Sequence, residues 1–79
     1  MKKVIMYSTP NCYYCNLAKD FFDEHDISYE VFNVQIDLEK RKEMMEKSGQ
    51  MGVPVIFVDE IMVNGFDEEK LRKLLEIGS

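Results

Sequence analysis

The sequence of 79 residues contains no tryptophan, two prolines, four glycines, two cysteines and one histidine. Its longest apolar runs, Val4–Tyr7 and Val53–Val58, are far shorter than the roughly 20 residues that a membrane-spanning helix needs. Basic residues are also scarce, since ten Lys and Arg stand against fifteen Asp and Glu, for a net charge of −5. Because phosphate backbones are bound by a basic surface, this composition argues against a nucleic-acid partner.

The length fits a single domain, residues 1–79, since domains start at about 50 residues. Hydrophobic residues make up 46 % of the chain and charged residues 32 %, which is ordinary for a globular protein. Met1-Lys2-Lys3 is similar to the start of a signal peptide, but the apolar stretch stops at Ser8-Thr9-Pro10, short of the about 7–15 residues expected there. We therefore expect a cytoplasmic monomer without a membrane partner.

Hydrophobic patterns predict four strands and three helices. The strands are expected at Lys3–Ser8, Ile27–Val34, Val55–Val58 and Ile61–Val63. The first helix should begin near Cys12, and the other two should follow the N-caps Asp37 and Asp67, with Gly49 ending the second. This β-α-β-α-β-β-α order predicts an α/β fold in which the first two strands are parallel and the last two form a hairpin.

The expected core includes an apolar face on the first and the last helix. Its predicted members are Leu17, Ala18, Phe21, Phe22, Leu71, Leu74 and Leu75. Methionines fill irregular gaps in protein interiors, so Met44, Met45 and Met51 are also expected to be core residues.

Both cysteines lie in Cys12-Tyr13-Tyr14-Cys15. A disulfide across so short a loop removes little entropy from the unfolded chain, so it would stabilise the fold poorly. In a cytoplasmic chain the spacing instead indicates redox or metal chemistry. A helix that begins at Cys12 stabilises its thiolate, and Cys15 follows almost one turn later on the same face. Cys12 is therefore the predicted nucleophile and Cys15 the predicted resolving residue.

The alternative for the cysteines is half of a zinc site, because zinc usually takes four Cys or His ligands. The single histidine, His25, comes ten residues after Cys15, which is about 15 Å along a helix. A zinc site would therefore need carboxylates or a second chain. The number of ligands favours redox chemistry.

Pro54 opens a strand that otherwise reads as a central one, although proline cannot donate to a sheet ladder. One interpretation is a cis Val53–Pro54 bond, which would turn the Val53 main chain towards a substrate beside the cysteines. The other is a trans proline at the first residue of an edge strand. The residues alone leave both open.

Three segments together resemble glutaredoxins: Val4–Cys15, Ser48–Ile56 and Val63–Asp67. The resemblance implies the thioredoxin-like fold, with a four-stranded mixed sheet and three helices, and it implies that Val53–Pro54 is cis. It also implies a dithiol oxidoreductase that reduces protein disulfides or glutathione mixed disulfides. Glutathione would then be the reductant and cosubstrate, with no permanently bound cofactor.

The resemblance also implies a glutathione site, carried over position by position. Its members in this chain are Tyr14, Arg41, Val53, Pro54, Phe66 and Asp67. Apart from the resemblance, Arg41 is equally an ordinary charge on a helix surface, and Asp67 is first a helix cap.

The chain departs from the usual glutaredoxin pattern at four positions. Thr9 and Met51 stand where many members have a lysine and an arginine. Tyr13 and Gly52 replace a proline and a threonine. The loss of two cations weakens a site for an anion such as glutathione.

The resemblance to glutaredoxins and these four departures leave two alternative functions open. One is an electron carrier that is reduced by a thioredoxin-reductase-type flavoprotein and donates electrons to ribonucleotide reductase or peroxidases; the Gly65-Phe66 dipeptide is similar to a turn in those donors. The other is a module in which Cys12 and glutathione hold a [2Fe–2S] cluster between two chains.

Overall fold

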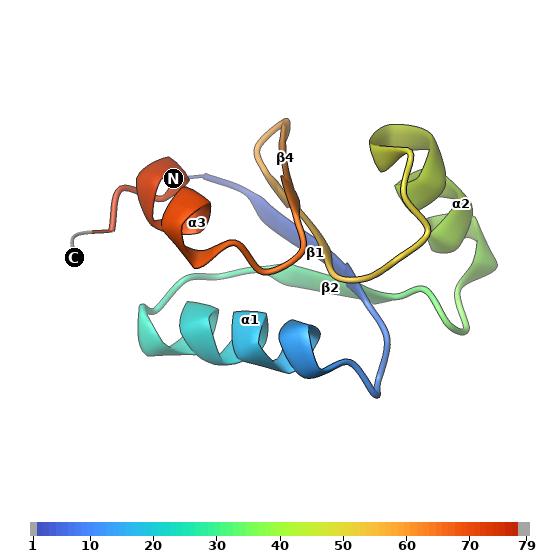
Figure 1. The fold of residues 1–79 in the computed structure, drawn as a ribbon, viewed down its shortest axis with the longest axis horizontal. Helices are drawn as coiled ribbons and strands as arrows, with labels where there is room; N and C mark the ends of the chain where they lie inside the picture. Colours follow the sequence, from blue (N-terminus) through green and yellow to red (C-terminus); the bar gives the residue numbers. More distant parts are fainter. Residues whose placement is uncertain (1, 78–79) are drawn as a thin grey trace.

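The structure is a computed structural model that describes residues 2–77, so the first residue and the last two of the predicted domain 1–79 lie outside the described residues. Within residues 2–77, four strands and three helices follow in the predicted order (Figure 1). The strands are β1 (Val4–Ser8), β2 (Glu30–Asn33), β3 (Val55–Val58) and β4 (Ile61–Asn64). The helices are α1 (Tyr13–Glu24), α2 (Leu38–Ser48) and α3 (Glu68–Leu74).

The strands form one mixed sheet in the order β2-β1-β3-β4. β1 is parallel to β2 and antiparallel to β3, and β3 and β4 form the predicted hairpin. The α/β fold class and its four-stranded mixed sheet are therefore confirmed. None of the helices between residues 2 and 77 has both the length and the apolar character that crossing a bilayer requires.

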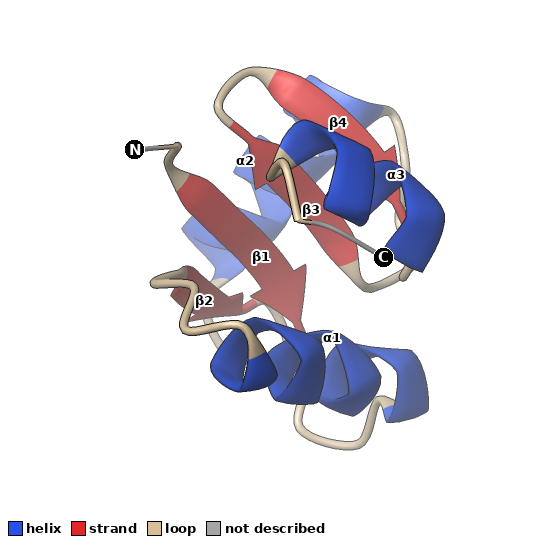
Figure 2. Cartoon of the chain, turned by 90° about the vertical axis from the view of Figure 1, so that its left-hand side faces the viewer, coloured by secondary structure: helices blue, strands red, loops and turns tan. Residues whose placement is uncertain are grey.

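The helices cover both faces of the sheet, with α1 and α3 on one face and α2 on the other (Figure 2). Two groups of buried side chains fill the two layers. The α1–α3 layer holds Val4, Met6, Ala18, Phe21, Phe22, Ile56, Val58, Val63 and Leu71. The α2 layer is smaller and holds Tyr7, Val34, Met44 and Val55. Of the seven predicted helix residues, four are buried in the α1–α3 layer and Leu74 and Leu75 pack against it, whereas Leu17 is half-buried and belongs to neither group.

The helix boundaries predicted from capping residues are confirmed. The side chains of Asp37 and Asp67 accept hydrogen bonds from main-chain N–H groups three residues later, at 3.1 and 3.2 Å. Gly49 ends α2 with φ of +70°, in the left-handed region that glycine adopts without a steric penalty. These local signals depend on few neighbours, which is why the sequence predicts them well.

The second strand is shorter than the predicted Ile27–Val34, because the first residues of that range belong to the turn that ends α1. The Ile27 N–H donates to the Phe22 carbonyl at 2.8 Å, and Asp26 before it has φ of +55°. Pairing with β1 starts only at Glu30. Smaller differences are that β1 begins at Val4 and that β4 extends to Asn64.

The prediction that three methionines fill the core is wrong for two of them. Met44 is buried, but Met45 and Met51 are exposed, Met51 to 64 %. Only a narrow side of α2 packs on the sheet, and each residue along a helix turns by about 100°, so the neighbour of a buried residue faces away. Met51 lies between α2 and β3, on the loop that leads to Pro54.

One polar interaction fastens α2 to the sheet. The buried Tyr7 hydroxyl of β1 donates to Glu43 Oε2 of α2. This hydrogen bond lowers the pKa of the Glu43 carboxyl, against the opposing effect of burial and with help from Lys40 and Lys47. Burial and the same bond raise the pKa of Tyr7, so the pair is a neutral phenol bound to a carboxylate near neutral pH.

Replacing Tyr7 with phenylalanine removes this bond. We expect Tyr7→Phe to lower the free energy of unfolding by about 1.5 kcal/mol at pH 7, as for a hydrogen bond to a charged group. The pKa of Glu43 is lower in the folded state, so the stabilisation is present above the ordinary value of 4.5 and is lost as the pH falls through the folded value. Urea unfolding at pH 7 and pH 3 measures both effects.

Tyr29→Phe is the matched control, since the Tyr29 hydroxyl donates to Asp23 at 3.3 Å on the protein surface. We expect this variant to lose less than about 0.5 kcal/mol. Equal losses in the two variants, or a Tyr7→Phe loss that is the same at both pH values, would show that the bond to the Glu43 carboxylate does not stabilise the fold.

Candidate active site

Four connecting segments meet at one edge of the sheet. Ser8, the last residue of β1, pairs with Asn33 at the end of β2, and the Val34 N–H donates to the Ser8 carbonyl at 2.9 Å. On the other side of β1, Tyr7 pairs with Val55, the first residue of β3. The segments after β1 and β2, and the one before β3, therefore leave the sheet side by side.

The fourth segment follows β4. Asn64, its last residue, pairs with Val55. The Gly65 N–H then donates to the Pro54 carbonyl at 3.1 Å, which ties the start of α3 to the segment before β3. Residues that are about 40 positions apart in the sequence are thus held around one point by main-chain bonds.

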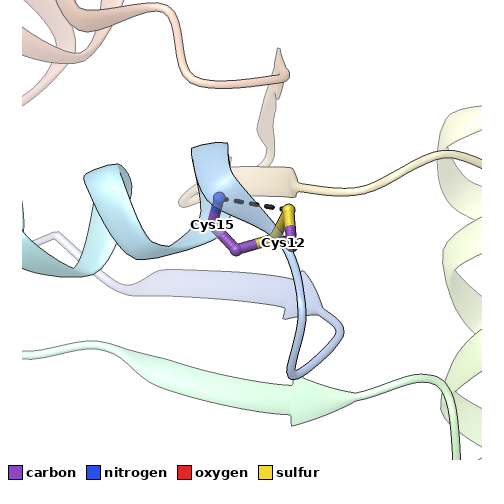
Figure 3. Close-up of a disulfide and its surroundings, with 2 residues drawn as sticks. All are labelled: Cys12 and Cys15. Carbon is purple, nitrogen blue, oxygen red and sulfur yellow. Dashed lines mark hydrogen bonds between the residues drawn. A yellow bond between two sulfur atoms is a disulfide. The ribbon is translucent and has the colours of Figure 1, made fainter.

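Cys12 and Cys15 form a disulfide at this edge, with Cα atoms 5.1 Å apart (Figure 3). Cys12 is the N-cap of α1, as predicted, and its Sγ accepts a hydrogen bond from the Cys15 N–H at 3.2 Å. Cys15 is completely buried, whereas Cys12 is half-buried. An incoming disulfide therefore reaches Cys12 first, in keeping with Cys12 as nucleophile and Cys15 as resolving residue.

The start of α1 suits a negative sulfur. The first turn of the helix carries no acidic residue that would oppose a thiolate. Main-chain N–H groups at a helix N-terminus also carry a partial positive charge. In the disulfide form the Cys15 N–H already donates to Cys12 Sγ, and this hydrogen bond would be stronger to the thiolate formed on reduction, because a charged acceptor binds more strongly than a neutral one.

The Val53–Pro54 bond is cis, which decides between the two interpretations that the residues alone left open. Pro54 is buried, and in Figure 3 the segment that leads into β3 runs past the Cys12 side of the disulfide. Among residues 2–77, the main-chain hydrogen bonds outside helices and strands include none from Val53. The main chain of Val53 thus has free hydrogen-bonding capacity in the segment that leads into β3.

The other predicted contact residues differ in position. Tyr14 is exposed in the first turn of α1, and Phe66 and Asp67 follow β4 at the same edge. Asp67 caps α3, so its first predicted role is confirmed. Arg41 is exposed one turn into α2, and within the described part of the chain its side chain has no ion-pair partner.

The whole edge shares a property that the sequence alone did not indicate. The runs that carry the four segments, residues 4–18, 31–36, 48–58 and 61–66, contain no charged residue, although 32 % of the chain is charged. Several of their large apolar side chains are nevertheless exposed, namely Tyr13, Tyr14, Ile36 and Met51. The rings of Tyr13 and Tyr14 pack edge to face, with centroids 5.2 Å apart. Charge-free runs are visible in the sequence, but only the sheet topology shows that they share one edge.

The zinc alternative gains no further ligands from the fold. Between residues 2 and 77, no group of three or more His, Cys, Asp or Glu side chains is placed to hold a metal ion. Cys12 and His25 cap opposite ends of α1, which has 12 residues.

Comparison with known proteins agrees with this geometry. The family model described as glutaredoxin matches residues 4–63. An uncharacterized glutaredoxin-like 8.6 kDa protein in the rubredoxin operon of Clostridium pasteurianum is 38 % identical, over 90 % of this chain and 95 % of that protein. The glutaredoxin-like protein NrdH of Lactococcus lactis is 34 % identical, over 90 % of this chain and 97 % of that protein.

Among solved structures, a variant of the thioredoxin-like protein BC3987 matches with a TM-score of 0.91 and 33 % identity, over 99 % of this chain and 100 % of that chain. The family model covers most of the sequence and includes both cysteines and the cis proline. The chain therefore belongs to the glutaredoxin family and is a thiol–disulfide redox protein with the thioredoxin-like fold.

Proposed function

We propose that this chain reduces disulfides of other proteins by dithiol exchange and is itself reduced by a flavoprotein of the thioredoxin-reductase type. The observation that carries the proposal is a half-buried nucleophile, Cys12, next to a buried resolving thiol, Cys15. Both belong to a charge-free run, residues 4–18, that exposes the apolar rings of Tyr13 and Tyr14. Glutathione, the reductant implied by the sequence resemblance, is the competing candidate.

The reaction takes place in two exchanges. The Cys12 thiolate attacks one sulfur of the substrate disulfide, a new S–S bond forms, and the other substrate sulfur leaves as a thiolate that takes up a proton. Cys15 then gives up its proton and attacks Cys12 Sγ, which releases the second substrate thiol. The substrate gains two electrons and two protons, and the chain keeps the Cys12–Cys15 disulfide.

The surroundings of Cys12 favour a protein partner over glutathione. Glutathione carries two carboxylates and one ammonium group near neutral pH, and charged ligands of this kind are held by charge-assisted hydrogen bonds. Thr9 and Met51 offer no cation, which leaves Arg41 for that purpose. By contrast, protein interfaces are depleted of charge at their centre and enriched in Tyr and Met, which is the composition around Cys12.

The Val53 main chain supplies the polar part of such an interface. Its free N–H and C=O groups suit an extended segment of a partner, which would pair with them as one more strand does. A partner cysteine on that segment would then lie beside Cys12.

The two-step mechanism predicts what single cysteine replacements do. Cys15→Ser should retain attack by Cys12 and lose resolution, so the variant accumulates as a mixed disulfide with a protein substrate such as insulin. Cys12→Ser should form no adduct, because the buried Cys15 is out of reach. Mass spectrometry after an acid quench detects the adducts. Turnover of protein disulfides by Cys15→Ser at the rate of the parent would contradict the resolving role of Cys15.

The reductant is tested by running two coupled reactions side by side. With NADPH and a thioredoxin reductase, we expect reduction of the oxidised chain at least about tenfold faster than with NADPH, glutathione and glutathione reductase. NADPH absorbance follows both reactions. A glutathione-linked rate equal to or above the flavoprotein-linked rate would overturn the choice of reductant and leave the dithiol mechanism in place.

Restoring the two cations at positions 9 and 51 provides a second test of the reductant. In Thr9→Lys/Met51→Arg, we expect the glutathione-linked rate to rise by about fivefold, because exposed ion pairs contribute up to about 1 kcal/mol. The control Thr9→Gln/Met51→Gln adds similar polar bulk without charge and should leave the rate unchanged. No gain in the charged variant would show that these two positions do not limit the use of glutathione.

A further inference from the structure

Two aliphatic side chains at the start of α2 are exposed without a role in the core. Ile36 is 77 % exposed and Leu38 is 69 % exposed, and neither belongs to the two groups of core residues found between residues 2 and 77. They flank Asp37, whose carboxylate caps α2, so their main chain is held in place. Exposed apolar side chains mark a contact surface where they extend a larger apolar patch, and Tyr13, Tyr14 and Met51 are also exposed in the segments at this end of the sheet.

These residues lie at the same end of the sheet as the redox site. The pairing of Ser8 with Asn33, and the hydrogen bond from the Val34 N–H to the Ser8 carbonyl, bring Val34 out of the sheet beside the end of β1. The Asp37 N–H then donates to the Asn33 carbonyl at 3.0 Å, so residues 33–37 turn at this end of the sheet. Figure 1 shows the connection from β2 to α2 and the connection from β1 to α1 at the same end of the sheet. A partner seated over Cys12 therefore has Ile36 within the area of a protein interface, about 800 Å² on each side.

We propose that Ile36 and Leu38 form a second contact area for the protein whose disulfide reacts at Cys12. The partner is a protein that carries an apolar surface beside its disulfide, since residues 4–18 and 31–36 contain no charge and the one carboxylate between Ile36 and Leu38, that of Asp37, is engaged as the cap of α2. This inference rests on the proposed function and adds to it the chemistry of the partner surface. Ile36 and Leu38 act as specificity residues, because they do not touch the reacting sulfur atoms.

The second contact area should affect the reaction with protein disulfides and not the reaction with small disulfides. A small disulfide contacts only the immediate surroundings of Cys12, whereas a protein also covers the start of α2. Truncation of an anchor side chain in an interface weakens binding measurably, and truncation of an uninvolved exposed side chain does not. Ile36→Ser should therefore slow the reaction with protein disulfides and leave the reaction with small disulfides unchanged.

The chain itself offers a matched control. Ile61 is also an exposed isoleucine, at 48 %, and it is the first residue of β4. It pairs with Val58, while the other end of β4 pairs with Val55 next to Pro54. Ile61 thus lies at the opposite end of the sheet from Cys12, and Ile61→Ser removes the same side chain away from the proposed contact area.

The experiment measures single-turnover oxidation of the reduced proteins. Parent, Ile36→Ser, Leu38→Ser and Ile61→Ser are mixed with insulin or with 2-hydroxyethyl disulfide, quenched in acid, alkylated and scored by mass. We expect the second-order rate constant with insulin to fall about tenfold in Ile36→Ser and to fall also in Leu38→Ser. With 2-hydroxyethyl disulfide, all four proteins should agree within about twofold. Ile61→Ser should match the parent with both substrates.

Several results would overturn the inference. Rates with insulin that are unchanged in Ile36→Ser and Leu38→Ser would remove the contact area and leave the proposed function standing. Equal losses in Ile61→Ser, or equal losses with the small disulfide, would point to a general defect of the fold. A parent dimer that becomes a monomer in Ile36→Ser, measured by sedimentation, would identify the occupant as a second copy of the chain. A parent that does not react with insulin would refute the proposed function, and the inference with it.

Discussion

The antiparallel pairing of β1 with β3 holds the two halves of the redox site together. Cys12 and Pro54 are 42 positions apart in the sequence. The pairing of Tyr7 with Val55 brings them to the same edge of the sheet. A shift of this register by one residue would turn the core side chains of β3 to the opposite face, so the buried layers enforce the register. The same core contacts that fix the register therefore hold the two halves of the site together.

Local signals in the sequence predicted much of this arrangement. The helix caps and Cys12 at the start of α1 depend on one or two neighbours, and all were found where the sequence placed them. The cis bond at Pro54 was open on the residues alone, because its energy depends on tertiary contacts. Burial of Met45 and Met51 was wrongly predicted for a related reason. Apolar identity does not show which side of a helix or loop meets the sheet.

The distribution of charged residues along the sequence could be interpreted only from the topology of the sheet. Charge-free runs in a sequence are normally read as strands, and all four of the runs here do contain a strand. Strand formation does not explain why the charge-free runs continue beyond the strands. They extend into the connecting segments at the edge that holds the cysteines, but not into those at the opposite edge. At the opposite edge, the turn between β3 and β4 carries Asp59 and Glu60. Charge is thus sparse at the edge that holds the cysteines, where Asp37 and Asp67 cap helices, and more frequent at the opposite edge.

An uncharged surface suits the chemistry of the site as well as its partners. The mixed disulfide persists only until Cys15 attacks, so a partner needs to be oriented briefly and then released. Long-range attraction between charges would speed encounter, but it would also hold partners of the opposite charge without regard to their disulfides. Apolar contacts act only at close range and therefore select partners by the shape of the surface around the disulfide. On this view the exposed side chains around Cys12, and Ile36 beyond them, discriminate among disulfides that the sulfur atoms alone would treat alike.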